Sequence, residues 1–278
     1  MPYTVRPITD HETLRQCEDL QIQVWGASDR EIVPFHHLIA AISSGGLVLG
    51  GFAPDGALVG FAYAFPGWLV GAPLWHSHMT GVLSAHRSAG LGLQLKRAQR
   101  EHALAAGIDR IVWTYDPLRA GNARFNLDRL GTVASRYHAD YYGVMSDAIN
   151  RGLASDRFEV DWFLRSPRVV SRLTGEAAPP VDPGVPWALE ASPAPQLTPG
   201  PERLRLHTRR LLVEIPADLD RLKVEDLAAA AQWRQSTRTV FTHYFAREYS
   251  ATEALRLPRG SESRIAYLLE QPDRREGE

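Results

Sequence analysis

A short glycine-containing loop constrains this chain more than any other feature of its sequence. The loop lies between a strand-like segment, Trp75–Leu83, and a helical pattern over residues 91–106; it reads Arg87-Ser88-Ala89-Gly90-Leu91-Gly92. Glycines allow the backbone to approach a ligand closely, and the unpaired N–H groups at the start of a helix favour an anion. The guanidinium of Arg87 adds a charge-assisted contact. The loop therefore predicts a binding site for a pyrophosphate group.

The helix that follows the loop is expected to be amphipathic. One stripe of it carries Leu91, Leu95, Ala98, His102 and Ala105, which we expect to face the core. Gly107 fits the end of the helix.

Other interpretations of the loop compete with this one. A Walker A loop is excluded because the Gly-Lys-Ser/Thr sequence is missing. A dinucleotide-binding loop would use Gly90 and Gly92, with Asp116 at the end of the next strand as the ribose-binding acid, but Leu95 replaces the third glycine. A strand-to-helix turn without any ligand is the third interpretation.

Composition narrows the class of protein. The 278 residues carry a net charge of −1, so no global basic field exists to hold nucleic acid or an anionic membrane. Cys17 is the one cysteine, which excludes an intramolecular disulfide and a cysteine-cluster zinc site, and we assign no metal role to His36 or His37. The N-terminus lacks the apolar region of a signal peptide, and no apolar run approaches the roughly 20 residues of a membrane helix. We expect a cytoplasmic protein.

The chain is expected to fall into three parts. Residues 1–165 alternate strand-like segments (3–8, 47–53, 57–65, 75–83, 111–115, 137–144 and 158–164) with helical ones (11–25, 34–42, 91–106 and 123–130). Residues 166–202 hold nine prolines and are expected to form an extended connector. Residues 203–278 suggest a strand (203–215), a helix (225–248) and a hairpin (249–257 and 264–269). There is no exact sequence repeat, but this order of elements is similar to that at the end of the first part.

The order of elements together with the loop resembles the GNAT superfamily of acetyltransferases. A second block supports the resemblance: Trp113–Leu118, Gly121–Gly131 and Tyr141-Tyr142-Gly143 are similar to a GNAT subgroup with a long C-terminal extension. The resemblance covers residues 3–165. It implies an α/β fold with a mixed, mainly antiparallel twisted sheet flanked by helices, beside a smaller C-terminal region of strand, helix and hairpin.

The resemblance also implies a co-substrate, acetyl-CoA or another acyl-CoA. Backbone N–H groups from Ser88 to Gly92 would bind its pyrophosphate, and Asn122 would contact it from the next helix. Val82 and Leu83 would hold its pantetheine arm by strand-like hydrogen bonds. The thioester would enter where this strand diverges from residues 111–115, and an N–H near Val82 would polarise its carbonyl.

The catalytic residues depart from the family pattern. Met79 stands where many members have a glutamate base, so the nearest titratable groups are His76 and His78, whose spacing of two puts both on one face of the strand. Leu127 stands where many members have an acidic tyrosine. Tyr141 is our candidate for that acid, with Tyr115 and Tyr137 as alternatives.

These features lead to one main hypothesis and two alternatives. The main hypothesis is an acyl-CoA-dependent N-acyltransferase in which the amine of a small-molecule or amino-acid-like acceptor attacks directly. Asp116 and Arg119 would bind a charged acceptor, and the C-terminal region would cover the acceptor side or complete a sheet across a homodimer. The alternatives are a catalytically silent acyl-CoA-binding module and a nicotinamide-dependent enzyme.

Overall fold

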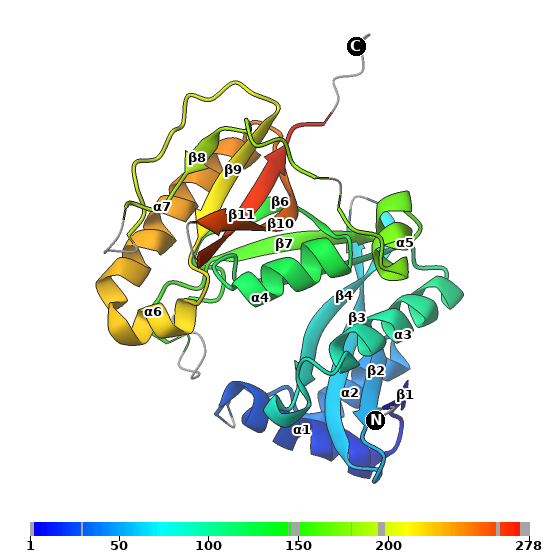
Figure 1. The fold of residues 1–278 in the computed structure, drawn as a ribbon. Helices are drawn as coiled ribbons and strands as arrows, with labels where there is room; N and C mark the ends of the chain where they lie inside the picture. Colours follow the sequence, from blue (N-terminus) through cyan, green and yellow to red (C-terminus); the bar gives the residue numbers. More distant parts are fainter. Residues whose placement is uncertain are drawn as a thin grey trace. The chain divides into compact units, whose positions relative to one another are not determined.

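The computed structural model describes residues 3–28, 30–69, 71–143, 145, 151–178, 180–193, 198–259 and 262–272. Contacts divide the chain into two compact units (Figure 1). The first contains Met1–Trp113 and Trp162–Ser166; the second contains Thr114–Met145, Gly152–Asp161 and Pro167–Glu278. The three parts expected from the sequence were residues 1–165, 166–202 and 203–278. The two units have other boundaries, so the three parts stay a prediction.

The first unit is a sheet with helices on both faces. In chain order it contains β1 (Thr4–Pro7), α1 (His11–Trp25), α2 (Phe35–Ser43), β2 (Leu47–Phe52), β3 (Leu58–Leu69), β4 (Ala72–Val82), the 3₁₀ turn η1 (Ser84–His86), α3 (Leu91–Ala105) and the start of β5 (Arg110–Tyr115). Strands β1 to β4 pair antiparallel, and β5 pairs with β4 in parallel. The expected mixed, mainly antiparallel α/β fold is confirmed.

Local chemistry explains where the first helix begins and ends. Asp10 caps α1 by accepting a hydrogen bond from the backbone N–H of Thr13 at 2.8 Å. Gly26 ends the helix in the left-handed region, with φ of 65°.

The two faces of the sheet carry different helices. Phe61 of β3 meets Trp25 of α1 edge-on, at 6.0 Å between ring centroids, while the neighbouring Gly60 faces Leu91 of α3. Because successive residues of a strand point to opposite faces, α1 packs on one face and α3 on the other. Helix α2 also packs on β2 and β3.

The second unit contains the remaining helices and strands. After the end of β5 come α4 (Ala120–Ala123), the π-helical segment η2 (Arg124–Arg129), β6 (Val133–His138), β7 (Arg157–Phe163), α5 (Pro167–Thr174), β8 (Trp187–Leu189), β9 (Arg210–Ile215), α6 (Leu219–Glu225), α7 (Leu227–Phe245), β10 (Ser250–Arg259) and β11 (Glu262–Glu270). Its strand order is β7-β6-β10-β11-β9-β8. Buried Phe158, Phe241 and Tyr267 form its aromatic centre, with ring centroids 4.6–5.5 Å apart.

Several expectations about this unit were wrong. The proline-rich segment 166–202 is not simply extended, because it contains α5 and β8. Buried Arg172 of α5 pairs with Glu253 of β10 at 2.6 Å, which fixes the helix on the sheet. The strand expected at 137–144 is β6, which starts earlier and ends at His138; Val144 lies outside the described residues. The helix expected at 225–248 is α7, which Asp226 caps, and a short helix that was not expected, α6, precedes it.

The expected core stripe of α3 is confirmed at Leu91 and Leu95 and wrong beyond them. The buried side chains belong to Leu91, Leu95, Lys96, Gln99 and Ala103, whereas His102 and Ala105 are exposed. Spacing of four residues continues from Leu91 to Ala103, and Lys96 lies beside this row.

Within the described ranges, no helix combines the length and the apolar character needed to cross a membrane.

Candidate functional site

The loop between β4 and α3 adopts a strained path that two residues make possible. Ser88 has φ of 63°, and Gly90 has φ of 86°. An added Cβ on Gly90 would meet no atom within 4 Å, so the space above the loop is open. Below it, Leu91 is 1% exposed and packs where Gly51 and Gly60 leave room. The buried leucine thus anchors the loop and the first turn of α3 to the sheet.

The loop presents a row of unused hydrogen-bond donors. Gly90 is the N-cap of α3 and has no side chain to satisfy the first amides of the helix. Within the described residues, the backbone N–H groups of Ser88, Ala89, Gly90, Leu91 and Gly92 donate to no backbone or side-chain acceptor. Unpaired amides at the start of a helix carry partial positive charge, so the loop can bind an anion through its backbone.

Arg87 holds the loop to the preceding strand. Its Nε donates to the carbonyl oxygen of Val82 at 3.1 Å and its Nη2 to that of Val24 in α1 at 3.5 Å, while the residue is exposed. Directly before Arg87, Nδ1 of His86 lies 3.1 Å from the Tyr3 hydroxyl. The guanidinium keeps further donors for an anion bound over the loop.

The backbone of β4 offers hydrogen bonds on its free side at Val82 rather than at Leu83. The Leu83 N–H donates to Val59 of β3, and the Leu83 carbonyl accepts from His86. Because antiparallel ladders alternate, Val82 and Thr80 direct their N–H and C=O groups away from β3. Within the described residues, β4 pairs with β5 only at Trp75–Ile111 and His76–Val112, so these groups lie beyond the paired stretch.

A cluster of aromatic and imidazole rings lies on the α1 and α2 face of β4. His76 stacks on Phe65 at 5.1 Å, and the His76 and His78 ring centroids are 6.2 Å apart. A β-bulge leaves His78 opposite no residue of β3, yet both histidines stay on one face, as their spacing predicted. Tyr63 completes the cluster, with His78 on one side and His37 of α2 on the other.

The environment of this imidazole cluster sets its chemistry. Partial burial, and then the proximity of His37, lower the pKa of His78, so its ring is neutral at pH 7 although the residue is exposed. Burial raises the pKa of Tyr63 to about 12. The Tyr63 hydroxyl has no hydrogen-bond partner among the described residues, and such a buried orphan costs free energy unless a ligand or water pairs with it. Sequence reasoning missed Tyr63 and His37, because only the packing of α2 on β3 brings them to His78.

Comparison with known proteins identifies the domain. Residues 14–131 match the family model described as Acetyltransferase (GNAT) family. Residues 14–131 form a GNAT acetyltransferase domain. The match confirms the predicted superfamily and the prediction that the protein is an acyltransferase. None of the curated proteins matches the chain.

Solved structures similar to the chain include three bacterial acetyltransferases. An IAA acetyltransferase from Bacillus cereus is 14% identical, covering 58% of this chain and 98% of its own, with a TM-score of 0.45. A GNAT family acetyltransferase from Elizabethkingia anophelis with acetyl-CoA bound is 12% identical (58% and 97% covered, TM-score 0.46). One from Desulfovibrio desulfuricans, named as putative, is 13% identical (59% and 99%, TM-score 0.48).

The remaining predicted site residues of the GNAT domain and its extension lie in the second unit. Asn122 is exposed on α4, with no side-chain hydrogen bond among the described residues. Tyr141 is 45% exposed in the turn after β6 and packs against His138 and Tyr142. Burial, and then Tyr142, raise the pKa of Tyr141, so it keeps its proton at pH 7. Tyr115 and Tyr137 are tied internally, to Tyr267 and to Asp156.

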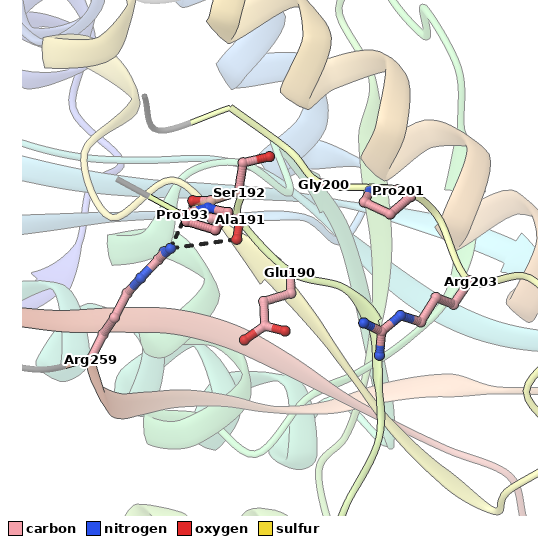
Figure 2. A pocket seen from close by; sticks show the side chains of 8 residues that line it. All are labelled: Glu190, Ala191, Ser192, Pro193, Gly200, Pro201, Arg203 and Arg259. Carbon is pink, nitrogen blue, oxygen red and sulfur yellow. Dashed lines mark hydrogen bonds between the residues drawn. The ribbon is translucent and has the colours of Figure 1, made fainter. Parts of the chain in front are cut away.

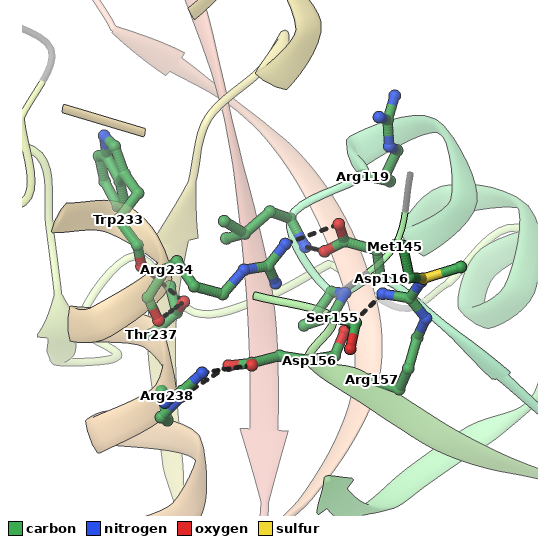
Figure 3. A network of polar contacts seen from close by, with 12 residues as sticks. Asp116, Arg119, Met145, Ser155, Asp156, Arg157, Trp233, Arg234, Thr237 and Arg238 are labelled. Carbon is green, nitrogen blue, oxygen red and sulfur yellow. Dashed lines mark hydrogen bonds and ion pairs between the residues drawn. The ribbon is translucent and has the colours of Figure 1, made fainter. Parts of the chain in front are cut away.

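Asp116 and Arg119 are engaged in ion pairs inside the second unit. Asp116 accepts from Arg234 of α7 at 2.6 Å and from the backbone of Leu118 at 2.9 Å (Figure 3). Arg119 pairs with Asp220 of α6 at 2.5 Å. A carboxylate so buried and paired is not presented to a ribose, which removes the observation that favoured a dinucleotide. Figure 3 also shows Arg238, one turn along α7, bound to buried Asp156.

An open hollow of about 490 Å³ lies elsewhere in the second unit (Figure 2). Two arginines, Arg203 and Arg259, line it, and Arg259 is already bound to Glu214 at 3.0 Å and to the carbonyl of Ser192 at 2.9 Å. Arg259 therefore holds chain segments together at this place, and we assign the hollow no ligand. Among the described residues, no group of three or more His, Cys, Asp or Glu side chains has the arrangement of a metal site.

Proposed function

We propose that the GNAT domain transfers an acetyl or other short acyl group from an acyl-CoA to the amine of a small-molecule or amino-acid-like acceptor. The observation that carries the proposal is the row of unpaired amides from Ser88 to Gly92 at the start of α3. The acetyl-CoA bound to the Elizabethkingia protein supports the same class of co-substrate.

The chain's own groups suit each part of an acyl-CoA. The loop amides, with Arg87 beside them, would hold the pyrophosphate. The backbone groups of Val82 and Thr80 would pair with the amides of the pantetheine arm. Thr80 thus replaces Leu83, which the sequence suggested beside Val82, because the Leu83 backbone groups are already bonded. The thioester would then lie further along β4, toward the end of its pairing with β5 rather than near Val82, and a strand N–H there would polarise its carbonyl as negative charge develops on the oxygen. Contact from Asn122 and an acidic role for Tyr141 remain predictions.

His78 is the proposed base. The acceptor amine arrives protonated, since its free pKa is roughly 10. The neutral His78 ring can take that proton, directly or through water, because its pKa lies below 6.5. The freed amine then attacks the thioester carbonyl within the ternary complex, without a covalent enzyme intermediate. Buried Cys17 offers no competing nucleophile, because burial raises its pKa to about 12.

The imidazole cluster also suits a small cationic acceptor. Phe65, Tyr63 and His76 present ring faces and edges around His78, and aromatic rings attract an ammonium group. The unpaired Tyr63 hydroxyl offers the acceptor a polar contact. Homodimer formation stays a prediction from the sequence.

The experiment is an acyl-transfer assay with a panel of small amines and amino acids. Free thiol is measured against the background of acyl-CoA hydrolysis, and products are identified by mass spectrometry. We expect at least one amine to release thiol and form an amide. Acyl-CoA binding without release by any amine would favour a silent module instead. Tight nicotinamide dinucleotide binding without CoA binding would overturn the proposal.

A further inference from the structure

Lys96 is the least expected side chain in the first unit. It is 3% exposed, on the face of α3 that packs against the sheet. The chain has 31 lysines and arginines together, yet only Lys96 and Lys223 are lysines. A buried lysine normally pairs with an acid, because burying an unpaired ammonium is costly. No ion pair of Lys96 occurs among the described residues, where its contacts are to uncharged groups.

The contacts of Lys96 converge on the place where β4 and β5 stop pairing. Its Nζ donates to the Ser77 hydroxyl at 2.7 Å and to Oε1 of Gln99 at 3.0 Å, and lies 3.9 Å from the centre of the Trp113 ring. Ser77 and Trp113 are the residues that directly follow the last paired positions of β4 and β5. Lys96 therefore lies under the end of the paired stretch, on the α3 face.

The buried, uncharged surroundings of Lys96 favour its neutral form. Burial alone lowers the pKa of Lys96 to about 7, so at neutral pH the group exchanges its proton readily. Of the charged groups on neighbouring elements of the first unit, His76 and His78 lie in the imidazole cluster, Arg100 donates to the Leu164 carbonyl and Arg110 lies over the Phe163 ring. Arg97, Glu101 and His102 of α3 are exposed.

We propose that Lys96, acting through the Ser77 hydroxyl, supplies the proton that the departing CoA thiolate takes up. This inference rests on the proposed function. It gives Lys96 the role for which the sequence suggested Tyr141, since Leu127 stands where many GNAT members have the tyrosine that acts as the acid.

The proton transfer balances with acyl transfer. When the tetrahedral intermediate collapses, the C–S bond breaks and its electron pair stays on sulfur. Sulfur takes the Ser77 hydroxyl proton, and the Ser77 oxygen takes one from the Lys96 ammonium. Lys96 is left as a neutral amine that solvent reprotonates, while the acceptor's proton leaves through His78. The products are an amide and a free thiol.

The titration of Lys96 can be observed directly. Protein labelled with ¹⁵N-lysine should show two side-chain signals, and Lys223→Arg assigns them. We expect Lys96 to titrate near pH 7, against about 10.4 for an unperturbed lysine. Coenzyme A should shift the Lys96 signal more than desulfo-coenzyme A, which lacks the sulfur. Equal shifts with both would contradict a contact with the thiol.

The pH dependence of turnover separates proton donation from a structural role. We expect wild-type kcat to fall as pH rises above about 7, where Lys96 loses its proton. Lys96→Arg should lower kcat by about 100-fold and abolish this alkaline limb, because a guanidinium keeps its charge. The KM for acyl-CoA should change little. Arg97→Gln, on the exposed side of the same helix, is the matched control and should keep the wild-type profile.

Two further variants guard against misfolding. Lys96→Met keeps the length of the side chain, and Ser77→Ala leaves Lys96 in place; each should lower kcat while acyl-CoA affinity is retained. The double variant Ser77→Ala/Lys96→Met should be no slower than the slower single one, because both belong to one relay. An unchanged alkaline limb in Lys96→Arg, or additive losses, overturns the relay and leaves the acyltransferase intact. A wild type without turnover overturns the proposed function and the relay with it.

Discussion

His78 is the single residue on which the proposed chemistry depends most. It lies at a β-bulge, where its ring is exposed to an acceptor while Tyr63 and Phe65 pack beside it. Bulges often redirect a side chain next to a site. His76 lies 6.2 Å away but stacks on Phe65, which suits it to shaping the cluster.

Replacing His78 should therefore affect turnover more than replacing His76. We expect His78→Ala to lower kcat/KM by roughly 100-fold or more, the usual contribution of a general base. In the wild type, kcat/KM should fall as pH drops through a value below 6.5, where His78 gains a proton. Steady-state rates across pH test this, with His76→Ala as control. Equal losses in both variants, or an acid limb that survives His78→Ala, would contradict the assignment.

Among the elements, α3 depends on two glycines of the sheet for its position. A Cβ on Gly51 would lie 2.7 Å from Cδ1 of Leu91, the first residue of α3. On the opposite face of β2, a Cβ on Gly50 would lie 2.7 Å from the Phe52 ring. Both positions are tight, but only the first bears on the loop.

This difference gives a matched pair of variants. Gly51→Ala and Gly50→Ala should each lower the free energy of unfolding by about 1–3 kcal/mol through overpacking. Only Gly51→Ala should also weaken acyl-CoA binding, because it displaces Leu91 and with it the loop amides. Chemical denaturation and calorimetry measure the two effects. Equal affinities in the two variants would argue against Leu91 as the anchor of the loop.

The elements that could be predicted are those with local signals. The helix over 11–25 and its Asp10 cap, the loop, and the strands around it follow from short patterns, and the structure has them. The missed elements depended on weaker signals: Pro167 is the first residue of α5, a position where proline is favoured, although its segment reads as extended. The expected core stripe of α3 did not include Lys96 and Gln99, because their burial depends on contacts with Ser77 and Trp113 that no local pattern shows.

At the scale of the whole molecule, the second unit holds a carboxyl group that opposes folding at neutral pH. Burial, and then the nearby Glu253, raise the pKa of Asp128 to about 6, while its Oδ1 accepts from the Ala254 backbone at 2.9 Å. The pKa of Asp128 is higher in the folded protein than in the unfolded chain. Its contribution to the free energy of unfolding is therefore fully present below pH 3.8, the pKa of the unfolded chain, and is lost as pH rises through about 6.

Asp128→Asn should remove this penalty and keep the backbone hydrogen bond. We expect the variant to be more stable than the wild type by about 1–3 kcal/mol at pH 8, with a smaller difference at pH 4. Urea denaturation at the two pH values measures it. A difference that does not change with pH would show that Asp128 titrates normally in the folded protein.

The central claim is that the amides of residues 88–92 bind the pyrophosphate of an acyl-CoA. Calorimetric titration with acetyl-CoA tests it most directly, on the wild type, Gly92→Asp and Gly92→Ala. An aspartate in the first turn favours the helix but repels a bound phosphate, so binding can be lost without loss of fold. We expect a dissociation constant on the order of micromolar for the wild type and Gly92→Ala, and at least about tenfold weaker binding by Gly92→Asp. No binding by the wild type, or equal binding by all three proteins, would contradict it.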